Sequence, residues 1–169
     1  IIVAVHEPGA QNPPCAGRRD LRMMRLALRA AREAAGRGEV PVGAVVARGE
    51  EVLALASNER EATGDPTAHA ELLAIRRAAA ALGGWRLTGC TLYSTLEPCP
   101  MCAGAAWAAR LSRIVYAAPD PKAGYAGTLH NTPSDRRLNH TASVLGGLLA
   151  QESATLLRDF FRERRLKRA

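Results

Sequence analysis

The sequence contains few aromatic residues and no hydrophobic run of membrane-spanning length. Aromatic side chains make up 4% of its 169 residues, and no segment has the aromatic pattern of an RNA-binding sheet, which disfavours a general base-stacking module. The opening Ile1-Ile2-Val3-Ala4-Val5 is too short for the apolar part of a secretion signal, and no basic residue precedes it. We therefore expect a cytoplasmic protein that is not inserted in a membrane.

Four cysteines without a secretion signal indicate a reducing compartment and metal binding rather than disulfides. Cys90 opens the predicted strand 90–95 and is expected to be buried and inert. Cys15 lies in a Gly- and Pro-containing lead-in and is expected to be a free, exposed thiol. The formal net charge of +7 favours an acidic partner only slightly, since solubility or genomic composition could produce the same excess.

The order of predicted elements indicates one α/β domain. Residues 1–19 are expected to form a disordered N-terminal extension, and 20–169 a single domain whose apolar residues can fill a core. The periodicity predicts, in order, a helix from Asp20 that ends at Gly36, a hairpin of strands 40–47 and 51–56, a helix that ends at Gly83, a strand at 90–95, a helix at 99–110, a strand at 113–117, a long connection at 118–140, a short strand at 141–145 and a C-terminal helix. Strands that alternate with helices favour a sheet with a parallel portion, covered on both faces, whose sites form at the carboxyl ends of strands.

The stretch His69-Ala70-Glu71 lies where a helix is predicted to start. Thr67 is the predicted N-cap of this helix. Residues two apart point to roughly opposite sides within a helix, so His69 and Glu71 can share a target only from the first turn.

Cys99 and Cys102 are three residues apart and therefore project from one face of the helix that Pro98 and Pro100 introduce. The positive end of this helix is expected to lower the pKa of both thiols, which favours metal binding because the metal ligand is the thiolate. With His69 they would give one ion three ligands and leave a fourth position open, as in catalytic zinc sites.

Each half of this pattern also has a simpler interpretation. An H-x-E triplet occurs by chance in many helices, and a lone C-x-x-C could be a thioredoxin-like redox pair. A closed structural zinc site would need a fourth ligand, and the nearest candidate, Cys90, is predicted to lie about 16 Å from the far end of its strand.

Taken together, the two stretches read H-x-E followed by P-C-x-x-C, which is typical of zinc deaminases of nucleobases. From about Arg25 to about Arg165 the sequence also resembles the bacterial tRNA-specific adenosine deaminases. The residues that carry this resemblance, in order, are 39–45, Asn58, 65–71, 95–105, 120–124 and 159–162.

The resemblance implies a three-layer α/β/α cytidine-deaminase-like fold with a mixed five-stranded sheet, a homodimer, one Zn²⁺ per subunit, and conversion of the wobble adenosine of a tRNA anticodon loop to inosine. It makes His69, Cys99 and Cys102 the zinc ligands and Glu71 the proton shuttle. Contacts to the anticodon stem-loop are implied for Asn58, Ala70, Asp120, Lys122, Phe161, Arg164 and Arg165. The sequence departs from the family at Tyr125, where a small residue is usual, and at Pro119.

Two other functions remain open on the residues alone. A zinc deaminase of free bases or nucleosides, of the guanine or cytidine type, would have the same zinc site, although the basic C-terminal helix disfavours it. A non-catalytic RNA-binding module with structural zinc would need a fourth protein ligand and would not need Glu71. The basic end of the C-terminal helix could either compensate the helix dipole or contact phosphates.

Overall fold

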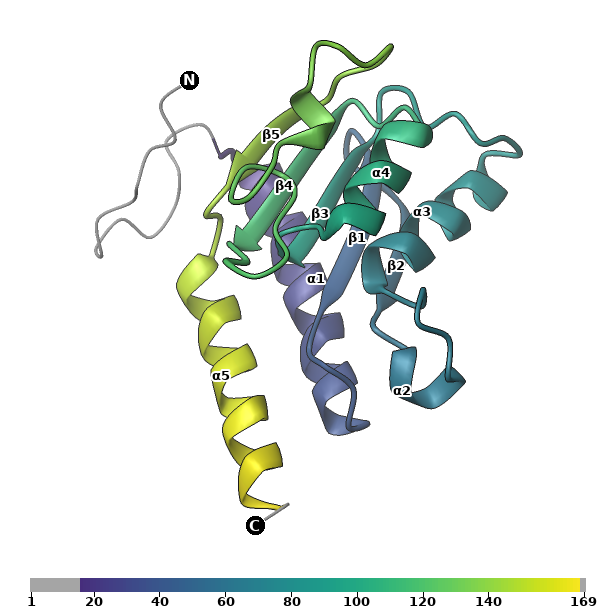
Figure 1. The fold of residues 1–169 in the computed structure, drawn as a ribbon. Coiled ribbons are helices and arrows are strands. Elements are labelled where there is room, and N and C mark those ends of the chain that lie inside the picture. The colour runs from purple at the N-terminus through teal and green to yellow at the C-terminus, as the bar shows by residue number, and fades with distance from the viewer. Residues whose placement is uncertain (1–15, 168–169) are drawn as a thin grey trace.

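A mixed five-stranded sheet in the order β2-β1-β3-β4-β5 organises the chain (Figure 1). The computed structural model describes residues 16–167. The strands are β1 (Gly43–Arg48), β2 (Glu51–Ser57), β3 (Thr91–Leu96), β4 (Arg113–Ala118) and β5 (Ser143–Gly146). β1 pairs antiparallel with β2 and with β3, whereas β3, β4 and β5 run parallel. The predicted mixed sheet is therefore confirmed.

Helices cover both faces of this sheet and give three layers. The long helices are α1 (Arg18–Gly36), α3 (Ala70–Ala81), α4 (Pro100–Ala108) and α5 (Ala150–Leu166). Alternate strand residues point to opposite faces, so Val46 and Leu92 pack in one core with α3 and α4, while Val45 and Tyr93 pack in a second core with α1. The predicted α/β/α architecture is confirmed.

The element boundaries depart from the predictions in a few places. α1 begins at Arg18, two residues before the predicted domain boundary. The short helix α2 (Arg60–Thr63) and the 3₁₀ turn η1 (Thr132–Ser134) form within segments for which no element is predicted. Cys90 is fully buried, as predicted. The expectations for residues 1–15, including Cys15, lie outside the described residues.

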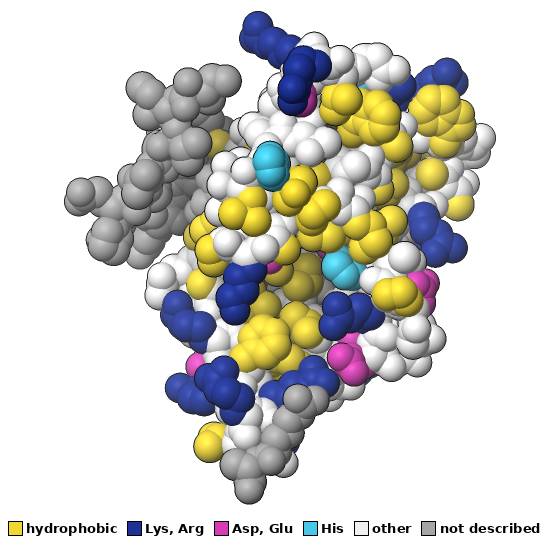
Figure 2. Space-filling view, viewed as in Figure 1, with side chains coloured by type: hydrophobic (Ala, Val, Ile, Leu, Met, Phe, Trp, Pro, Cys, Tyr) yellow, Lys and Arg dark blue, Asp and Glu magenta, His cyan; other side chains and the backbone are white. Residues whose placement is uncertain are grey.

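The face that carries α3 and α4 is hollowed where several elements meet. Figure 2 shows this hollow with apolar side chains on its floor and Lys and Arg side chains around it and toward the end of α5. In the described part of the chain, no helix combines the length and the apolar character needed to cross a bilayer.

Candidate active site

The first half of the site is the start of α3. His69 itself is the N-cap of this helix, with extended backbone angles (φ −74°, ψ 146°), and Ala70 is its first helical residue. The prediction that Thr67 is the N-cap is wrong. The backbone N–H and the hydroxyl of Thr67 both donate to Oδ1 of Asp65, each at 2.7 Å, so Asp65 closes the turn before the helix and His69 is left at its end.

The second half is the start of α4, which follows β3 directly. Cys99 is the N-cap and Pro100 occupies the first turn, where its missing N–H costs no helical hydrogen bond. Cys102 lies one turn further along and is buried. Both cysteines thus come from the beginning of a helix at the carboxyl end of a parallel strand, as predicted.

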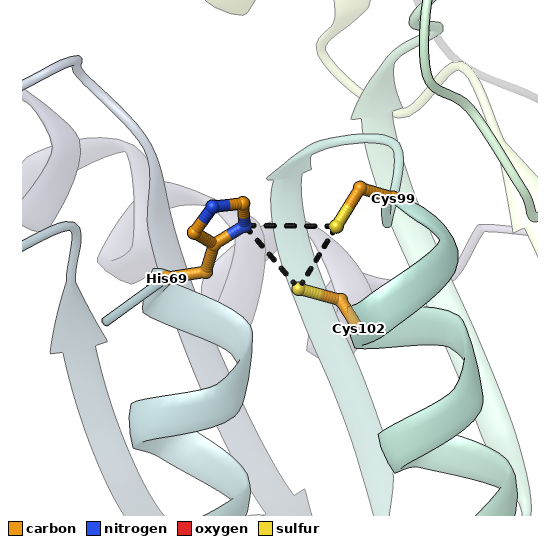
Figure 3. A group of neighbouring side chains, drawn as sticks. All are labelled: His69, Cys99 and Cys102. Carbon is orange, nitrogen blue, oxygen red and sulfur yellow. Dashed lines mark hydrogen bonds between the residues drawn. The ribbon is translucent and has the colours of Figure 1, made fainter. Parts of the chain in front are cut away.

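His69, Cys99 and Cys102 form a compact triangle (Figure 3). The distances from His69 Nδ1 to Cys99 Sγ, from His69 Nδ1 to Cys102 Sγ, and between the two sulfurs are all 3.6 Å. A tetrahedral zinc ion, with bonds of about 2.3 Å to sulfur and 2.0–2.1 Å to nitrogen, requires separations of about 3.6–3.8 Å between such atoms. The donor set therefore fits zinc, and within residues 16–167 no fourth side chain joins the group.

Glu71 is a buried carboxyl group beside this triangle, with 4% of its surface exposed. Burial raises the pKa of Glu71 to about 7, although the neighbouring His69 opposes this shift. A carboxyl group with such a pKa can both accept and donate a proton near neutral pH, which suits general acid–base chemistry.

The two thiols differ in their affinity for a proton when no metal is bound. Hydrogen bonding with Cys102 and with His69 lowers the pKa of Cys99 to about 4, and the bond to Cys99 raises the pKa of His69. The pKa of Cys102 is raised instead, because it hydrogen-bonds with the Cys99 sulfur and is buried. The prediction of two lowered thiol pKa values is right for Cys99 and wrong for Cys102, since one thiolate disfavours a second charge 3.6 Å away.

Asn58 follows β2 and lies beside the turn that leads to His69. The backbone N–H of the next residue, Glu59, donates to the carbonyl of Ala68 (3.0 Å). The side-chain amide of Asn58 donates to the carboxylate of Glu39. Ala70, the first residue of α3, is fully buried, backbone and methyl group alike.

Asp120 and Lys122 lie in the loop that follows β4. Oδ1 of Asp120 accepts the N–H groups of Lys122 (2.9 Å) and Ala123 (3.2 Å), so Asp120 shapes this turn, and the Lys122 side chain is exposed. Further along the loop, the Tyr125 ring contacts the His130 ring at a centroid distance of 4.8 Å.

The predicted contacts on α5 lie at its exposed end. Phe161 is 41% exposed and packs edge-on against Phe160. Arg164 forms an ion pair with Glu61 of α2 (3.5 Å), while Arg165 is exposed. No described contact joins Phe161 or Arg165 to the His69–Cys99–Cys102 triangle.

Two buried carboxylates that sequence reasoning did not assign to the site support its loops. Glu39 accepts hydrogen bonds from Asn58 and from α2. Glu97 accepts the backbone N–H groups of Asp120, Ala126 and Thr128 and the hydroxyl of Thr128. The sequence feature that points to such residues is an acidic residue directly beside an apolar strand, because a buried charge there is costly unless it is paired.

Comparisons with known proteins agree with this geometry. The MafB19-like deaminase family matches residues 19–165, and the chain therefore belongs to this family. More particularly, it is 49% identical over 145 residues to the tRNA-specific adenosine deaminase of Bacillus subtilis (strain 168), covering 86% of this chain and 90% of that protein. The predicted resemblance to tRNA-specific adenosine deaminases is thus confirmed.

Two further matches extend the comparison. A solved structure from a study of A-to-I editing by tRNA:A34 deaminases aligns with a TM-score of 0.77 and 45% identity, covering 80% of this chain and 99% of that one. The tRNA(Ile)-lysidine synthase of Deinococcus deserti is 52% identical over 143 residues, which are 84% of this chain and 27% of that longer protein.

Proposed function

We propose that this protein converts the wobble adenosine of a tRNA anticodon loop to inosine by hydrolytic deamination, with zinc as its cofactor. The observation that carries the proposal is the His69–Cys99–Cys102 triangle with the buried Glu71 beside it, in a chain 49% identical to a protein named tRNA-specific adenosine deaminase. A structural zinc site would have four protein ligands, whereas the described group has three.

His69, Cys99 and Cys102 would hold the zinc ion. When bound, such an ion acts as a Lewis acid and makes water an effective nucleophile near neutral pH. The separations of 3.6 Å among the three donor atoms support this assignment, as does the mixture of one imidazole and two sulfurs.

Glu71 would move the protons of the reaction. Water adds its oxygen to C6 of adenine, and Glu71 takes one proton from this water and delivers it to ring nitrogen N1. Glu71 then takes the remaining proton from the new C6 hydroxyl and delivers it to the amino group. The bond between C6 and the amino nitrogen breaks, ammonia leaves with the bonding electrons, and the C6 carbonyl of inosine remains. The pKa of Glu71, raised by burial to about 7, supports this dual role.

The RNA would lie across the basic surface around the hollow in Figure 2. Asn58 directly follows β2 and Ala70 begins α3, Asp120 and Lys122 lie in the loop after β4, and Arg164, Arg165 and Phe161 lie at the end of α5. Unpaired bases in a loop can leave their stack at low cost, so an anticodon loop suits a site that requires an extruded base. A cytoplasmic location, where tRNA is used, goes with this proposal.

We also propose that two copies of the chain form a homodimer. Support comes from α4, which leaves apolar side chains only half-buried, among them Met101, Ala105 and Trp107. Packing of such a helix face against a second copy would remove this apolar surface from water. Light scattering coupled to size-exclusion chromatography tests it, and a monomer at micromolar concentration would contradict it.

The deciding experiment incubates the zinc-loaded protein with synthetic anticodon hairpins that carry A, C or G at the wobble position, and with free adenosine, cytidine and guanine. We expect inosine from the A hairpin alone, measured by nucleoside analysis after digestion. Turnover of free guanine or cytidine with an unchanged hairpin would instead support a deaminase of free bases or nucleosides.

A further inference from the structure

Glu39 is a carboxylate that the fold buries behind Asn58, with 1% of its surface exposed. Its Oε2 accepts hydrogen bonds from Nδ2 of Asn58 (2.9 Å) and from the backbone N–H of Glu61 (3.2 Å). Its Oε1 accepts the backbone N–H of Ala62 (2.7 Å). All three partners are N–H donors, so this position requires a side chain that only accepts hydrogen bonds.

The backbone on both sides of this contact is fixed. The N–H of Glu39 donates to the carbonyl of Ala34 at the end of α1 (3.1 Å), and the N–H of Asn58 donates to the carbonyl of Val42 (3.0 Å). The N–H of Glu59 donates to the carbonyl of Ala68, one residue before His69. Asn58 is therefore held between Glu39 on one side and the turn that carries His69 on the other.

The amide of Asn58 has two orientations of nearly equal shape, because its oxygen and its nitrogen differ little in size. Only the hydrogen-bond partners decide between them. Glu39 cannot donate as a carboxylate, so it selects the orientation in which Nδ2 faces it. One Nδ2–H is then engaged with Glu39, and among the described residues no hydrogen bond reaches Oδ1 of Asn58.

We propose that Glu39 is a positioning residue that fixes the Asn58 amide so that its second N–H can donate to the target base. This inference rests on the proposed function. The Hoogsteen edge of adenine offers N7 as a hydrogen-bond acceptor, and an asparagine amide is a common partner for that edge. Glu39 itself does not touch the substrate.

The test is Glu39→Gln, which keeps the shape of the side chain but replaces one oxygen by a donor. The new amide nitrogen meets either the N–H of Ala62, or Nδ2 of Asn58 together with the N–H of Glu61. In the first case a neutral amide oxygen replaces the carboxylate and holds the Asn58 amide less firmly, and in the second the Asn58 amide must rotate and present its oxygen to the base. We expect kcat/KM for the A hairpin to fall about 10- to 100-fold, as for an unpaired buried donor or acceptor. KM should change less than about threefold, because phosphate contacts supply most of the RNA affinity.

A hairpin with 7-deazaadenosine at the wobble position gives a readout that a purely structural role would not move. This base lacks the N7 acceptor, so kcat/KM of the wild-type protein should be about 10- to 100-fold lower on this hairpin than on the A hairpin. For Glu39→Gln, kcat/KM should differ little between the two hairpins. The matched control is Glu59→Gln, on the same loop, whose carboxylate pairs with Arg77 (3.0 Å) and not with Asn58. It should behave as the wild type on both hairpins.

The double variant Glu39→Gln with Asn58→Asp separates folding from positioning. The new glutamine can donate to the new aspartate and still accept the N–H of Ala62, so hydrogen–deuterium exchange at Ala62 should return to the wild-type rate, whereas the N–H of Glu61, which faces the new amide nitrogen, should exchange faster. Activity should stay low, because the group facing the base is then an acceptor. A double variant with restored activity, or Glu39→Gln with an unchanged kcat/KM and an intact 7-deaza penalty, would overturn the inference. A wild-type protein inactive on every hairpin would instead overturn the proposed function.

Discussion

The residues to which we assign the chemistry lie at two helix starts, and a conservative change of Glu71 can test its assigned role. Glu71→Gln keeps the size of this buried side chain but removes its acid–base function. We expect turnover of the A hairpin to fall by about 10²- to 10⁴-fold, since that is the usual contribution of a positioned acid–base group.

The zinc content of Glu71→Gln, measured by atomic emission on the purified protein, should equal that of the wild type, because His69, Cys99 and Cys102 are unchanged. Wild-type turnover in this variant would remove Glu71 from the mechanism. Loss of zinc together with activity would make Glu71 a support of the metal site instead.

The unequal thiols give a second prediction at the residue scale. In the metal-free protein the pKa of Cys99 is lowered to about 4 by its hydrogen bonds with Cys102 and His69. Cys99 should therefore be a thiolate throughout pH 6–8, and its alkylation by iodoacetamide should be nearly independent of pH there. An ordinary thiol reacts about tenfold faster for each pH unit in this range.

Mass spectrometry of peptides from protein alkylated at pH 6, 7 and 8 measures this rate for each cysteine. The buried Cys102, whose pKa is raised, should remain largely unmodified. Added zinc should protect Cys99. A Cys99 rate that rises steeply with pH would contradict the assignment.

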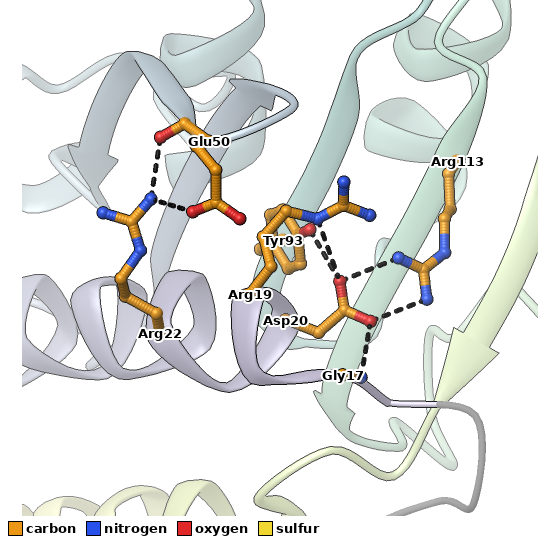
Figure 4. A network of polar contacts seen from close by, with 7 residues as sticks. All are labelled: Gly17, Arg19, Asp20, Arg22, Glu50, Tyr93 and Arg113. Carbon is orange, nitrogen blue, oxygen red and sulfur yellow. Dashed lines mark hydrogen bonds and ion pairs between the residues drawn. The ribbon is translucent and has the colours of Figure 1, made fainter.

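Among the elements, α1 is attached to the sheet by one buried carboxylate, Asp20 (Figure 4). Arg113 of β4 donates two hydrogen bonds to it (2.8 and 2.9 Å), and the Tyr93 hydroxyl of β3 donates a third (2.8 Å). Burial alone would raise the pKa of Asp20, but these donors more than offset it, and its pKa is lowered.

We expect Asp20→Asn to lower the free energy of unfolding by about 2–4 kcal/mol at pH 7. A carboxyl group whose pKa is lower in the folded state stabilises the protein above its unfolded pKa of about 3.9 and loses this effect as the pH falls through its folded value. The difference between wild type and variant should therefore shrink below about pH 4. Urea unfolding at pH 7 and pH 3.5 measures it, and an unchanged difference would contradict the role of the charge.

The loop after β4 requires the backbone at Gly124 to lie close to the carboxylate of Glu97. A Cβ atom on Gly124 would overlap the carboxylate of Glu97, the group that holds the N–H groups of Asp120, Ala126 and Thr128. We expect Gly124→Ala to displace this loop and to lower kcat/KM for the A hairpin by about tenfold, the effect of roughly 1.4 kcal/mol, while the zinc content stays constant.

The control for the loop is Gly84→Ala, since a Cβ there meets no atom within 4 Å. Steady-state kinetics on the A hairpin compares the two variants. Equal activity of Gly124→Ala and the wild type would show that the loop tolerates the added methyl group.

The motifs show how far the sequence predicts such a site. The positions of His69, Cys99 and Cys102 at helix starts follow from the prolines, the apolar periodicity and the spacing of the motif, all of which are local. The buried roles of Glu39 and Glu97 do not, because their donors come from residues about 20 to 30 positions away and depend on how the loops fold. Thr67 fails as the N-cap for a local reason instead, since its N–H and its hydroxyl both donate to Asp65, two residues earlier.

At the scale of the whole molecule, the net charge of +7 is unevenly distributed over the surface. Basic side chains gather around the hollow and at the end of α5. Arg165 is exposed there. Arg165→Ala should weaken binding of hairpins of any loop sequence, and it should reduce the slope of log K against log salt concentration by about one for the lost phosphate contact.

Fluorescence anisotropy at several salt concentrations measures this slope. Arg48→Ala is the matched control, because Arg48 is an exposed arginine at the β1–β2 turn, at the opposite end of β1 from the residues beside Asn58. A slope that changes equally in both variants would show that only the overall charge matters.

An ion bound by the His69–Cys99–Cys102 triangle would also have a mechanical consequence. His69 and Cys99 are 30 positions apart and begin different helices, so an ion held between them would close a long loop, as a disulfide does. A cross-link of that length removes about 3–4 kcal/mol of chain entropy from the unfolded ensemble. Chelation should therefore loosen the packing of α3 against α4 as well as stop the reaction, and the supply of zinc would govern how long the folded protein survives.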